Sequence, residues 1–327
     1  MKKWIILFLC LFIGVLLFQG GKLMNKKNEV AVQQIVKEKY MNDEGLIHAY
    51  PYQRDSQYLS ESIGLYMSFL LRVKDKEEFE DQYQKLVAYF LIQENEKAFI
   101  RWELREDVSV NALIDDVRII DALIKGSETF HEDKYRDTAK VLQSTIHDNQ
   151  MRDGLYTDFY DWNLKMPSSR LTYSYITPEL LQLLPDTEKN RESIEKIESA
   201  SIFFPEYNNI EANQYVNANE AHMVDQLLIA QSKEYIGQET DFKKWIVAEW
   251  QEKKVINGRY NKGNLKPTVP YESLAVYYYL YTYFMGINQP KLAKEVKVEA
   301  NKVADDHDSD QEHFFDFIHF QLLQLSD

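Results

Sequence analysis

The sequence predicts an all-α protein whose main part is one domain. Glycine and proline are scarce, at 11 and 8 of 327 residues, so few positions interrupt helices. Apolar residues recur at helical spacing in many segments, and strand-like alternation is weak except near residues 154–160. About ten to twelve helices of roughly 10–18 residues fit this pattern. Because composition does not shift along residues 28–327, we expect a single domain there.

Residues 1–27 form a separate segment, which we predict to be an export signal or a membrane anchor. Lys2 and Lys3 precede an apolar run over residues 4–18, the order that export signals show. Because no small-residue cleavage site follows, an uncleaved anchor is favoured. Cys10, the single cysteine, lies inside the run, which does not favour a lipid anchor and leaves the exported part without disulfides. We expect the domain at the outer face of the membrane, or secreted.

The chain is acidic, with a net charge of −14 at pH 7. Such a surface repels nucleic acid and anionic lipid headgroups. It is compatible with neutral glycans and attracts cationic ones. We therefore exclude nucleic acid as a partner.

Local patterns place four of the expected helices, in chain order. Asp75 and Glu78 form a capping-box-like start. The residues that follow share one helical face: Phe79, Tyr83, Leu86, Val87 and Phe90. Thr177 and Pro178 are typical of a helix start over 179–184. Another stripe comprises Val224, Leu227, Leu228, Gln231 and Tyr235, and residues 271–285 form an apolar, tyrosine-rich helix.

Glu61 is the first candidate for acid–base chemistry. It follows Ser60 at the start of an apolar helical run over residues 63–67. A carboxyl beside a buried face has a raised pKa and can stay protonated, which a proton donor to a glycosidic oxygen requires. A glutamate in a first turn also stabilises a helix N-terminus in the ordinary way. The local pattern leaves both roles open.

Further acids stand at the starts of two later helices. Asp115 and Asp116 precede an apolar helix, and adjacent helical side chains point about 100° apart. At most one of them therefore faces a given site, and both can instead serve the helix start. Asp225 lies near the inward stripe of its helix, with Glu220 just upstream. Hydrolysis of a glycosidic bond needs a second, ionised carboxylate, and either residue can supply it.

Taken in order, these segments resemble glycoside hydrolase family 8 over residues 58–230. The matching motifs are Ser60-Glu61, Ile100-Arg101-Trp102, the Asp115-Asp116 pair, Leu171–Pro178 and Phe204–Tyr207. Ser62 stands where the family has glycine, and Ile114 stands where it has the first Asp of an Asp-x-Asp motif. The arginines and tryptophan that the family carries after residue 217 are absent. The resemblance implies an (α/α)6 barrel over residues 28–327.

The resemblance also implies roles for the residues that match. Glu61 is then the proton donor, Asp225 the base, with Glu220 as the alternative, and Asp116 the catalytic residue that grips the sugar. The expected substrate-binding residues are Trp102, Asp115, Tyr66, Tyr173, Tyr175 and Glu220, and Trp162 also lies near a matched motif. The family inverts, which predicts the two carboxyls about 6.5–9.5 Å apart. No metal or cofactor is implied.

The function expected from this resemblance is that of an extracellular, monomeric glycosidase. Anchored, diverged family members accompany exopolysaccharide synthesis, so the expected substrate is a β-linked bacterial exopolysaccharide. One alternative is a non-catalytic glycan-binding or assembly factor on the same barrel, which the missing motif residues favour. Another is a different six-hairpin enzyme, such as an unsaturated glucuronyl hydrolase. The acidic surface argues against its anionic substrates.

Overall fold

The computed structural model describes residues 31–197, 202–212, 214–216, 218–306 and 308–326. The predicted anchor over residues 1–27 lies outside the described residues. Among those described, no helix is both long and apolar enough to cross a membrane. The described part is mostly helical, as the sequence predicts.

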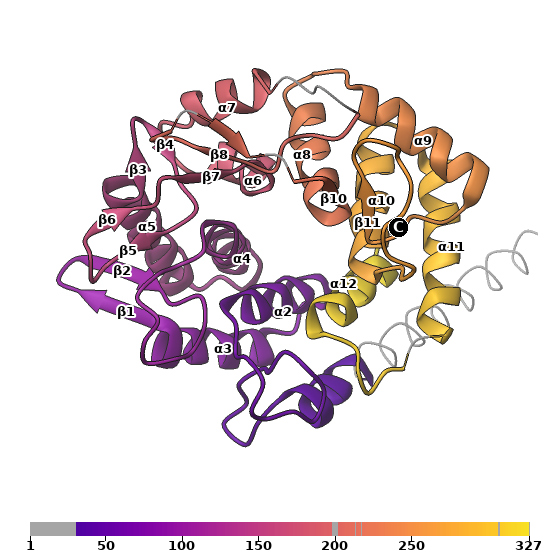
Figure 1. Cartoon of the computed structure of the whole chain (residues 1–327). Coiled ribbons are helices and arrows are strands. Elements are labelled where there is room, and N and C mark those ends of the chain that lie inside the picture. The colour runs from indigo at the N-terminus through magenta and orange to yellow at the C-terminus, as the bar shows by residue number, and fades with distance from the viewer. Residues whose placement is uncertain (1–30, 198–201, 213, 217, 307, 327) are drawn as a thin grey trace, which may run out of the picture.

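Six helices form a closed ring at the centre of the fold (Figure 1). They are α2 (Ser60–Val73), α4 (Leu113–Phe130), α6 (Pro178–Leu183), α8 (Met223–Tyr235), α10 (Leu274–Gly286) and α12 (Phe314–Gln324). Each packs against the next in this order, and α12 packs against α2, which closes the ring. This is the (α/α)6 type of barrel that the resemblance implies.

Outer helices cover the ring and alternate with the inner ones along the chain. They are α3 (Lys76–Lys85), α5 (Asp133–Asn149), α7 (Glu188–Glu195), α9 (Asp241–Lys253) and α11 (Pro290–Asp306). The outer helix α11 buries one stripe, made by Leu292, Ala293, Val296 and Ala300. The inner helix α10 instead buries side chains on most of its circumference. A helix enclosed by neighbours is apolar all round, whereas a covering helix is amphipathic.

The predicted helix starts are confirmed. The side chain of Asp75 accepts a hydrogen bond from the backbone N–H of Glu78 at 3.0 Å, which caps α3. Thr177 accepts from the N–H of Leu180 at 3.2 Å, with Pro178 in the first turn of α6. The stripe that begins at Phe79 continues from α3 into the π-helix η2 (Leu86–Phe90).

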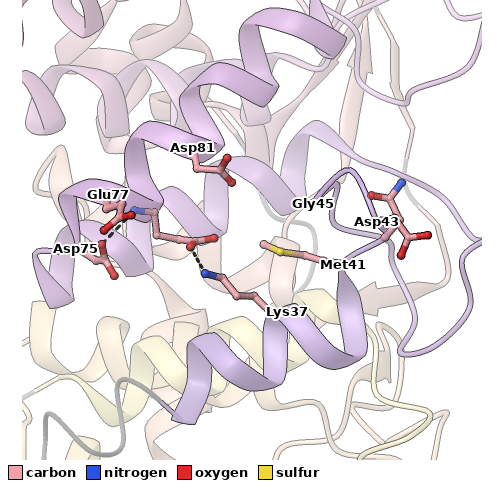
Figure 2. A pocket seen from close by; sticks show the side chains of 9 residues that line it. Lys37, Met41, Asp43, Gly45, Asp75, Glu77 and Asp81 are labelled. Carbon is pink, nitrogen blue, oxygen red and sulfur yellow. Dashed lines mark hydrogen bonds and ion pairs between the residues drawn. The ribbon is translucent and has the colours of Figure 1, made fainter.

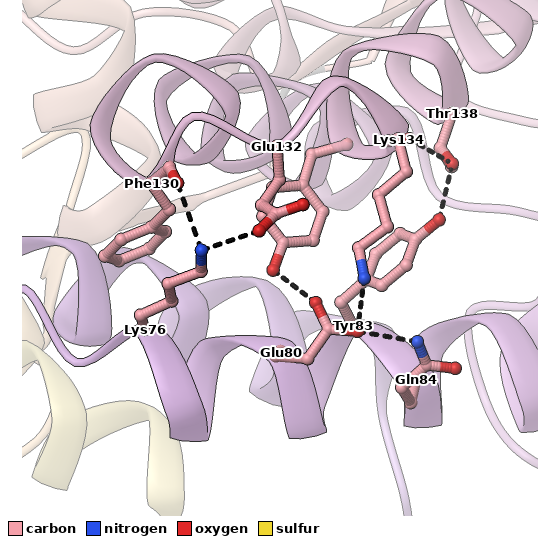
Figure 3. Close-up of polar contacts among 9 residues, drawn as sticks. Lys76, Glu80, Tyr83, Gln84, Phe130, Glu132, Lys134 and Thr138 are labelled. Atoms are coloured by element: carbon pink, nitrogen blue, oxygen red, sulfur yellow. Dashed lines mark hydrogen bonds and ion pairs between the residues drawn. The ribbon is translucent and has the colours of Figure 1, made fainter.

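A polar seam joins α3 to α5 on the outside of the barrel (Figure 3). Lys134 of α5 contacts Glu80 of α3 at 2.6 Å, and the Tyr83 hydroxyl lies 2.9 Å from that of Thr138. The hydroxyl of the buried Tyr135 also donates to Glu80. Exposed ion pairs contribute little to stability, so the buried rings beneath them hold this seam together.

The structure contains short strands that the sequence pattern mostly misses. Within the described residues they form four antiparallel pairs and one three-stranded sheet. The strands are β1 (Leu91–Glu94), β2 (Lys97–Ile100), β3 (Met151–Arg152), β4 (Leu155–Tyr156), β5 (Tyr160–Asp161), β6 (Met166–Pro167), β7 (Arg170–Thr172), β8 (Tyr207–Asn209), β9 (Gln214–Val216), β10 (Glu220–His222) and β11 (Arg259–Asn261). Strands of two to four residues are too short for alternation to be recognised.

Several strands lead directly into the starts of inner helices. Strand β10 ends where α8 begins, and β7 runs into the 3₁₀ turn η3 (Tyr173–Tyr175) before α6. Strand β2 is followed by the segment that pairs with the start of α2. The strands therefore build up the end of the ring where the inner helices start.

Candidate active site

Acidic side chains gather at the N-terminal end of the ring. Glu61, Asp115, Asp225 and Asp316 lie in the first turns of α2, α4, α8 and α12. An outer helix returns the chain between each inner helix and the next, so the inner helices start at the same end. Exposed N–H groups at helix starts stabilise carboxylates. The fold thus concentrates carboxyl groups at one end of the barrel.

The start of α2, which carries Glu61, is held by a backbone hydrogen bond and by close packing against α4. The N–H of Ser60 donates to the carbonyl of Trp102 at 2.9 Å, which places Trp102 beside the start of the helix. One turn later, a Cβ on Gly64 would stand 3.0 Å from Ile119, so the missing side chain lets α2 approach α4 closely. Burial and the nearby charge of Asp115 raise the pKa of Glu61 to about 8, and Arg118 opposes this rise.

The two adjacent aspartates of α4 point to different places, as their helical spacing predicts. Asp115 accepts a hydrogen bond from Nη1 of Arg118 at 2.6 Å and acts electrostatically on Glu61. Asp116 is 1% exposed and accepts from Nδ2 of Asn111. The same Asn111 accepts from the N–H of Tyr160 at 2.7 Å. Asp116 therefore contacts a buried loop, whereas Asp115 acts on Glu61; the role of Asp116 in gripping the sugar stays a prediction.

Asp225 has the opposite protonation preference to Glu61. Burial alone raises its pKa, but His222, Ser174 and Arg170 outweigh burial and lower it. His222 lies one turn away, with its Nδ1 3.3 Å from a carboxylate oxygen of Asp225. The carboxylate at the start of α8 is therefore favoured in its ionised form.

Tyr175 links the α4 and α8 sides of the site. It is partly exposed and ends the turn η3. Burial, then the charges of Asp158, Asp115 and Asp225, raises the pKa of its phenol. The charges of Asp115 on α4 and Asp225 on α8 therefore both act on this one hydroxyl. The role of Tyr175 in binding substrate stays a prediction.

Arg170 and Asp158 brace this part of the site. Nε of Arg170 lies 3.0 Å from Asp158, and its guanidinium lies 4.0 Å from the ring centre of Tyr207. Asp158 accepts two hydrogen bonds from Thr172, both at 2.6 Å. Its backbone carbonyl accepts from the N–H of Leu113, the first residue of α4. The cation near Asp225 is thereby tied to the helix that carries Asp115.

Glu220 lines a hollow beside Asp225. The hollow has a volume of about 420 Å³ and also includes Glu206, Asn219 and Arg259. Glu220 pairs along β10 with β11 and lies 3.5 Å from Nη1 of Arg259. The structure therefore brings both candidate bases, Asp225 and Glu220, to one hollow, and only Asp225 stands in the first turn of an inner helix.

Three aromatic residues expected at the site lie elsewhere. Tyr66 is fully buried and stacks on Phe69 in the core. Tyr173 is 1% exposed and packs near Tyr215. Trp162 belongs to a small separate core cluster with Phe99 and Tyr160. Tyr66 and Tyr173 thus pack in the main core, whereas the backbone carbonyl of Trp102 lies on the N–H of Ser60, next to Glu61 in the chain.

Other residues of the site were not predicted from the sequence. They are Arg118, Tyr279, His319, Asp158, Arg170 and Ser174. Arg118 follows Asp115 by three positions, so helical spacing alone places the two side chains on one face. No local pattern connects Tyr279 or His319 with Glu61, because they come from α10 and α12. His222 lies beside Asp225.

A second acidic hollow lies outside the ring, between η1 (Val36–Tyr40) and α3 (Figure 2). Lys37 forms an ion pair there with Glu78 at 2.5 Å, and Asp75 caps α3. Over the described part of the chain, no group of three or more His, Cys, Asp or Glu side chains could hold a metal ion. The acids of this hollow serve local structure.

The ring and its carboxyl groups define a protein with the six-hairpin glycosidase fold, and comparison with solved structures agrees. PssZ from Listeria monocytogenes has a TM-score of 0.83 and 32% identity, over 90% of this chain and 94% of PssZ. A novel alpha-amylase from Clostridium perfringens has a TM-score of 0.76 and 18% identity, over 90% and 96% of the two chains. Endoglucanase Cel10, a family 8 glycosyl hydrolase from Klebsiella pneumoniae, has a TM-score of 0.65 and 13% identity, over 90% and 98%.

One curated relative is similar in sequence. The "Putative lipoprotein YdaJ" of Bacillus subtilis (strain 168) is 33% identical over 248 residues, which are 72% of this chain and 67% of YdaJ. No family model matches the chain. With the identity and coverage of PssZ, this shows that the chain belongs to the family of PssZ and YdaJ, whose fold resembles that of family 8 glycoside hydrolases.

Proposed function

We propose that the protein hydrolyses a β-linked polysaccharide with inversion, using Glu61 as the proton donor and Asp225 as the base. The observation that carries this proposal is the opposite protonation preference of the two carboxyls. The pKa of Glu61 is raised to about 8, so it holds its proton at neutral pH. The pKa of Asp225 is lowered, so it is ionised there. A glycosidase needs one carboxyl of each kind.

In the proposed reaction, Glu61 gives its proton to the glycosidic oxygen as the bond to the anomeric carbon breaks. Asp225 takes a proton from a water molecule, whose oxygen attacks the anomeric carbon from the opposite face. Asp115 replaces Asp116 as the acid that holds the sugar at the cleavage point, because Asp115 is the one that faces Glu61. Trp102, Tyr175 and Glu220 border the path of the polymer.

We assign the substrate to the class of neutral or cationic exopolysaccharides and the protein to the outer face of the membrane. The net charge of −14 and the carboxyl groups at the site disfavour anionic polymers. The description of YdaJ as a lipoprotein supports a place in the cell envelope. The predicted anchor over residues 1–27 is consistent with the same place.

Release of reducing ends by the full chain from β-linked polymers, including exopolysaccharide, tests the proposal. Wild-type protein is expected to release them, whereas Glu61→Gln and Asp225→Asn bind the polymer without cleaving it. Starch is the control, because one structure of similar fold is an alpha-amylase. Cleavage of starch alone contradicts the β-linkage. Binding without cleavage by wild type instead supports the glycan-binding alternative.

Nuclear magnetic resonance of the first product tests the stereochemistry. An inverting enzyme converts a β-linked polymer into a product with the α anomer at its new end. A β anomer indicates a covalent intermediate and a different pair of carboxyls. If Glu220→Gln is inactive and Asp225→Asn is still active, Glu220 is the base in place of Asp225. The inverting mechanism is then unchanged.

A further inference from the structure

Beneath Glu61 and Asp115, three side chains from three inner helices are linked by hydrogen bonds. Arg118 of α4 donates to Asp115 at 2.6 Å, and its guanidinium and the hydroxyl of Tyr279 on α10 shift each other's pKa through charge and hydrogen bonding. That hydroxyl lies 3.0 Å from Nε2 of His319 on α12. Tyr279 and His319 are 7% and 1% exposed, and with Arg118 they line a hollow of about 510 Å³ inside the ring.

The surroundings of His319 determine the direction of these hydrogen bonds. Its Nδ1 lies 2.6 Å from the carbonyl oxygen of Phe315, which can only accept, so Nδ1 carries a proton. Burial and the charge of Arg118 lower the pKa of His319 to about 3, so the ring is neutral and Nε2 is an acceptor. Tyr279 therefore donates to Nε2, and its oxygen remains free to accept from Arg118.

We propose that Tyr279 and His319 are positioning residues that fix the guanidinium of Arg118 beneath Glu61 and Asp115. This inference rests on the proposed function of Glu61 as the proton donor. The charged and titratable groups that act on Glu61 are Asp115 and Arg118 from α4, Asp316 from α12 and Tyr279 from α10. Arg118 is the cation in this set and offsets the two aspartates.

Displacement of Arg118 weakens that offset. The carboxyl of Glu61 then binds its proton more tightly, becomes a poorer donor, and Asp115 loses the partner that orients it. A fixed guanidinium therefore serves both carboxyls. Because Arg118 sits on α4, Tyr279 from α10 holds it on the side that its own helix cannot reach, and His319 from α12 holds Tyr279.

The first test compares the pH dependence of kcat in Tyr279→Phe and Tyr278→Phe. Tyr278 is the matched control, because it precedes Tyr279 on α10 and its ring also packs 5.0 Å from His319, whereas the hydroxyl that lies 3.0 Å from His319 belongs to Tyr279. In Tyr279→Phe we expect kcat to fall about tenfold, with a smaller change in KM. The alkaline limb of the pH–kcat profile of Tyr279→Phe is expected to shift to higher pH by about half a unit. Identical profiles for the two variants overturn the proposal.

His319→Gln provides a second variant, in which the Tyr279 hydroxyl loses its acceptor in the native position. We expect the alkaline limb to move in the same direction as in Tyr279→Phe. Movement of the alkaline limb to lower pH in both variants contradicts the assignment. It would mean that Arg118 moves closer to Glu61 when its contact with Tyr279, or that of Tyr279 with His319, is lost.

A second test does not depend on activity, so it separates this inference from the proposed function. It measures how much Glu61→Gln changes the urea midpoint of unfolding at pH 9 in wild type, in Tyr279→Phe and in Tyr278→Phe. The change is expected to be larger in Tyr279→Phe than in wild type, because an ionised Glu61 is less well compensated there. In Tyr278→Phe it should equal that of wild type. Equal changes in all three backgrounds overturn the inference, whether or not any polymer is cleaved.

Discussion

Replacing Glu61 with glutamine removes a carboxyl that the fold keeps protonated, and this makes the effect on stability depend on pH. Its pKa rises from 4.5 to about 8 in the folded protein. At about 1.36 kcal/mol per pKa unit, ionising it in the fold costs roughly 5 kcal/mol more than in the unfolded chain. Glu61 is only partly enclosed, and water on its open side reduces this to about 2–3 kcal/mol.

The sign follows from the raised pKa. A carboxyl whose pKa is higher in the folded state supports folding fully below its unfolded pKa of 4.5, and this support is lost as pH rises through about 8. Glutamine keeps the shape and has no charge to lose. Glu61→Gln should therefore match wild-type stability at pH 5 to within about 1 kcal/mol, and exceed it at pH 9 by about 2–3 kcal/mol.

Urea unfolding at pH 5, 7 and 9, followed by far-ultraviolet circular dichroism, measures this difference. Glu188→Gln is the matched control, because Glu188 also lies in the first turn of a helix, α7, but is exposed. Its effect on stability should not change with pH. Turnover in Glu61→Gln should fall by about 10²–10⁴. A stability difference that stays constant from pH 5 to pH 9 would refute the reasoning.

Three further predictions concern the rest of the site. His222→Ala should move the acidic limb of the pH–rate profile to higher pH, because Asp225 loses a partner that lowers its pKa; an unmoved limb contradicts this. Asp115→Asn should lower turnover with little change in urea midpoint, whereas Asp116→Ala should destabilise the fold by about 1–3 kcal/mol. The reverse pattern would restore Asp116 to the site. Tyr66→Phe should leave KM and kcat unchanged, because its ring lies in the core; a raised KM would place it at the substrate.

The helices and their caps could be predicted because they depend on neighbouring residues. Asp75 and Thr177 cap α3 and α6 as their local sequences indicate. Glu61 could be found because the apolar residues that follow it show that its helix is buried. Asp225 could be found because it falls beside an apolar stripe of α8. Each of these signals spans less than about two helical turns.

Helical spacing alone could not show which of several residues near the matched motifs lies at the site. It showed that Asp115 and Asp116 point about 100° apart, but the position of α4 in the ring decided that Asp115 meets Glu61. Tyr66 and Tyr175 both lie near matched motifs, and only the structure shows Tyr66 in the core and Tyr175 partly exposed. An inner helix is buried on most sides, so apolar periodicity does not reveal which side faces the site.

By itself the sequence determined an acidic, helical domain and the acids that open its helices, because helix formation and capping are local. Only the tertiary structure decided which of those acids share a site and what holds them there. Tyr279 and His319 are 40 positions apart and come together through closure of the ring. Burial beside Asp115 raises the pKa of Glu61, and His222, Ser174 and Arg170 lower that of Asp225. Such contacts form between segments distant in sequence, so no local pattern encodes them.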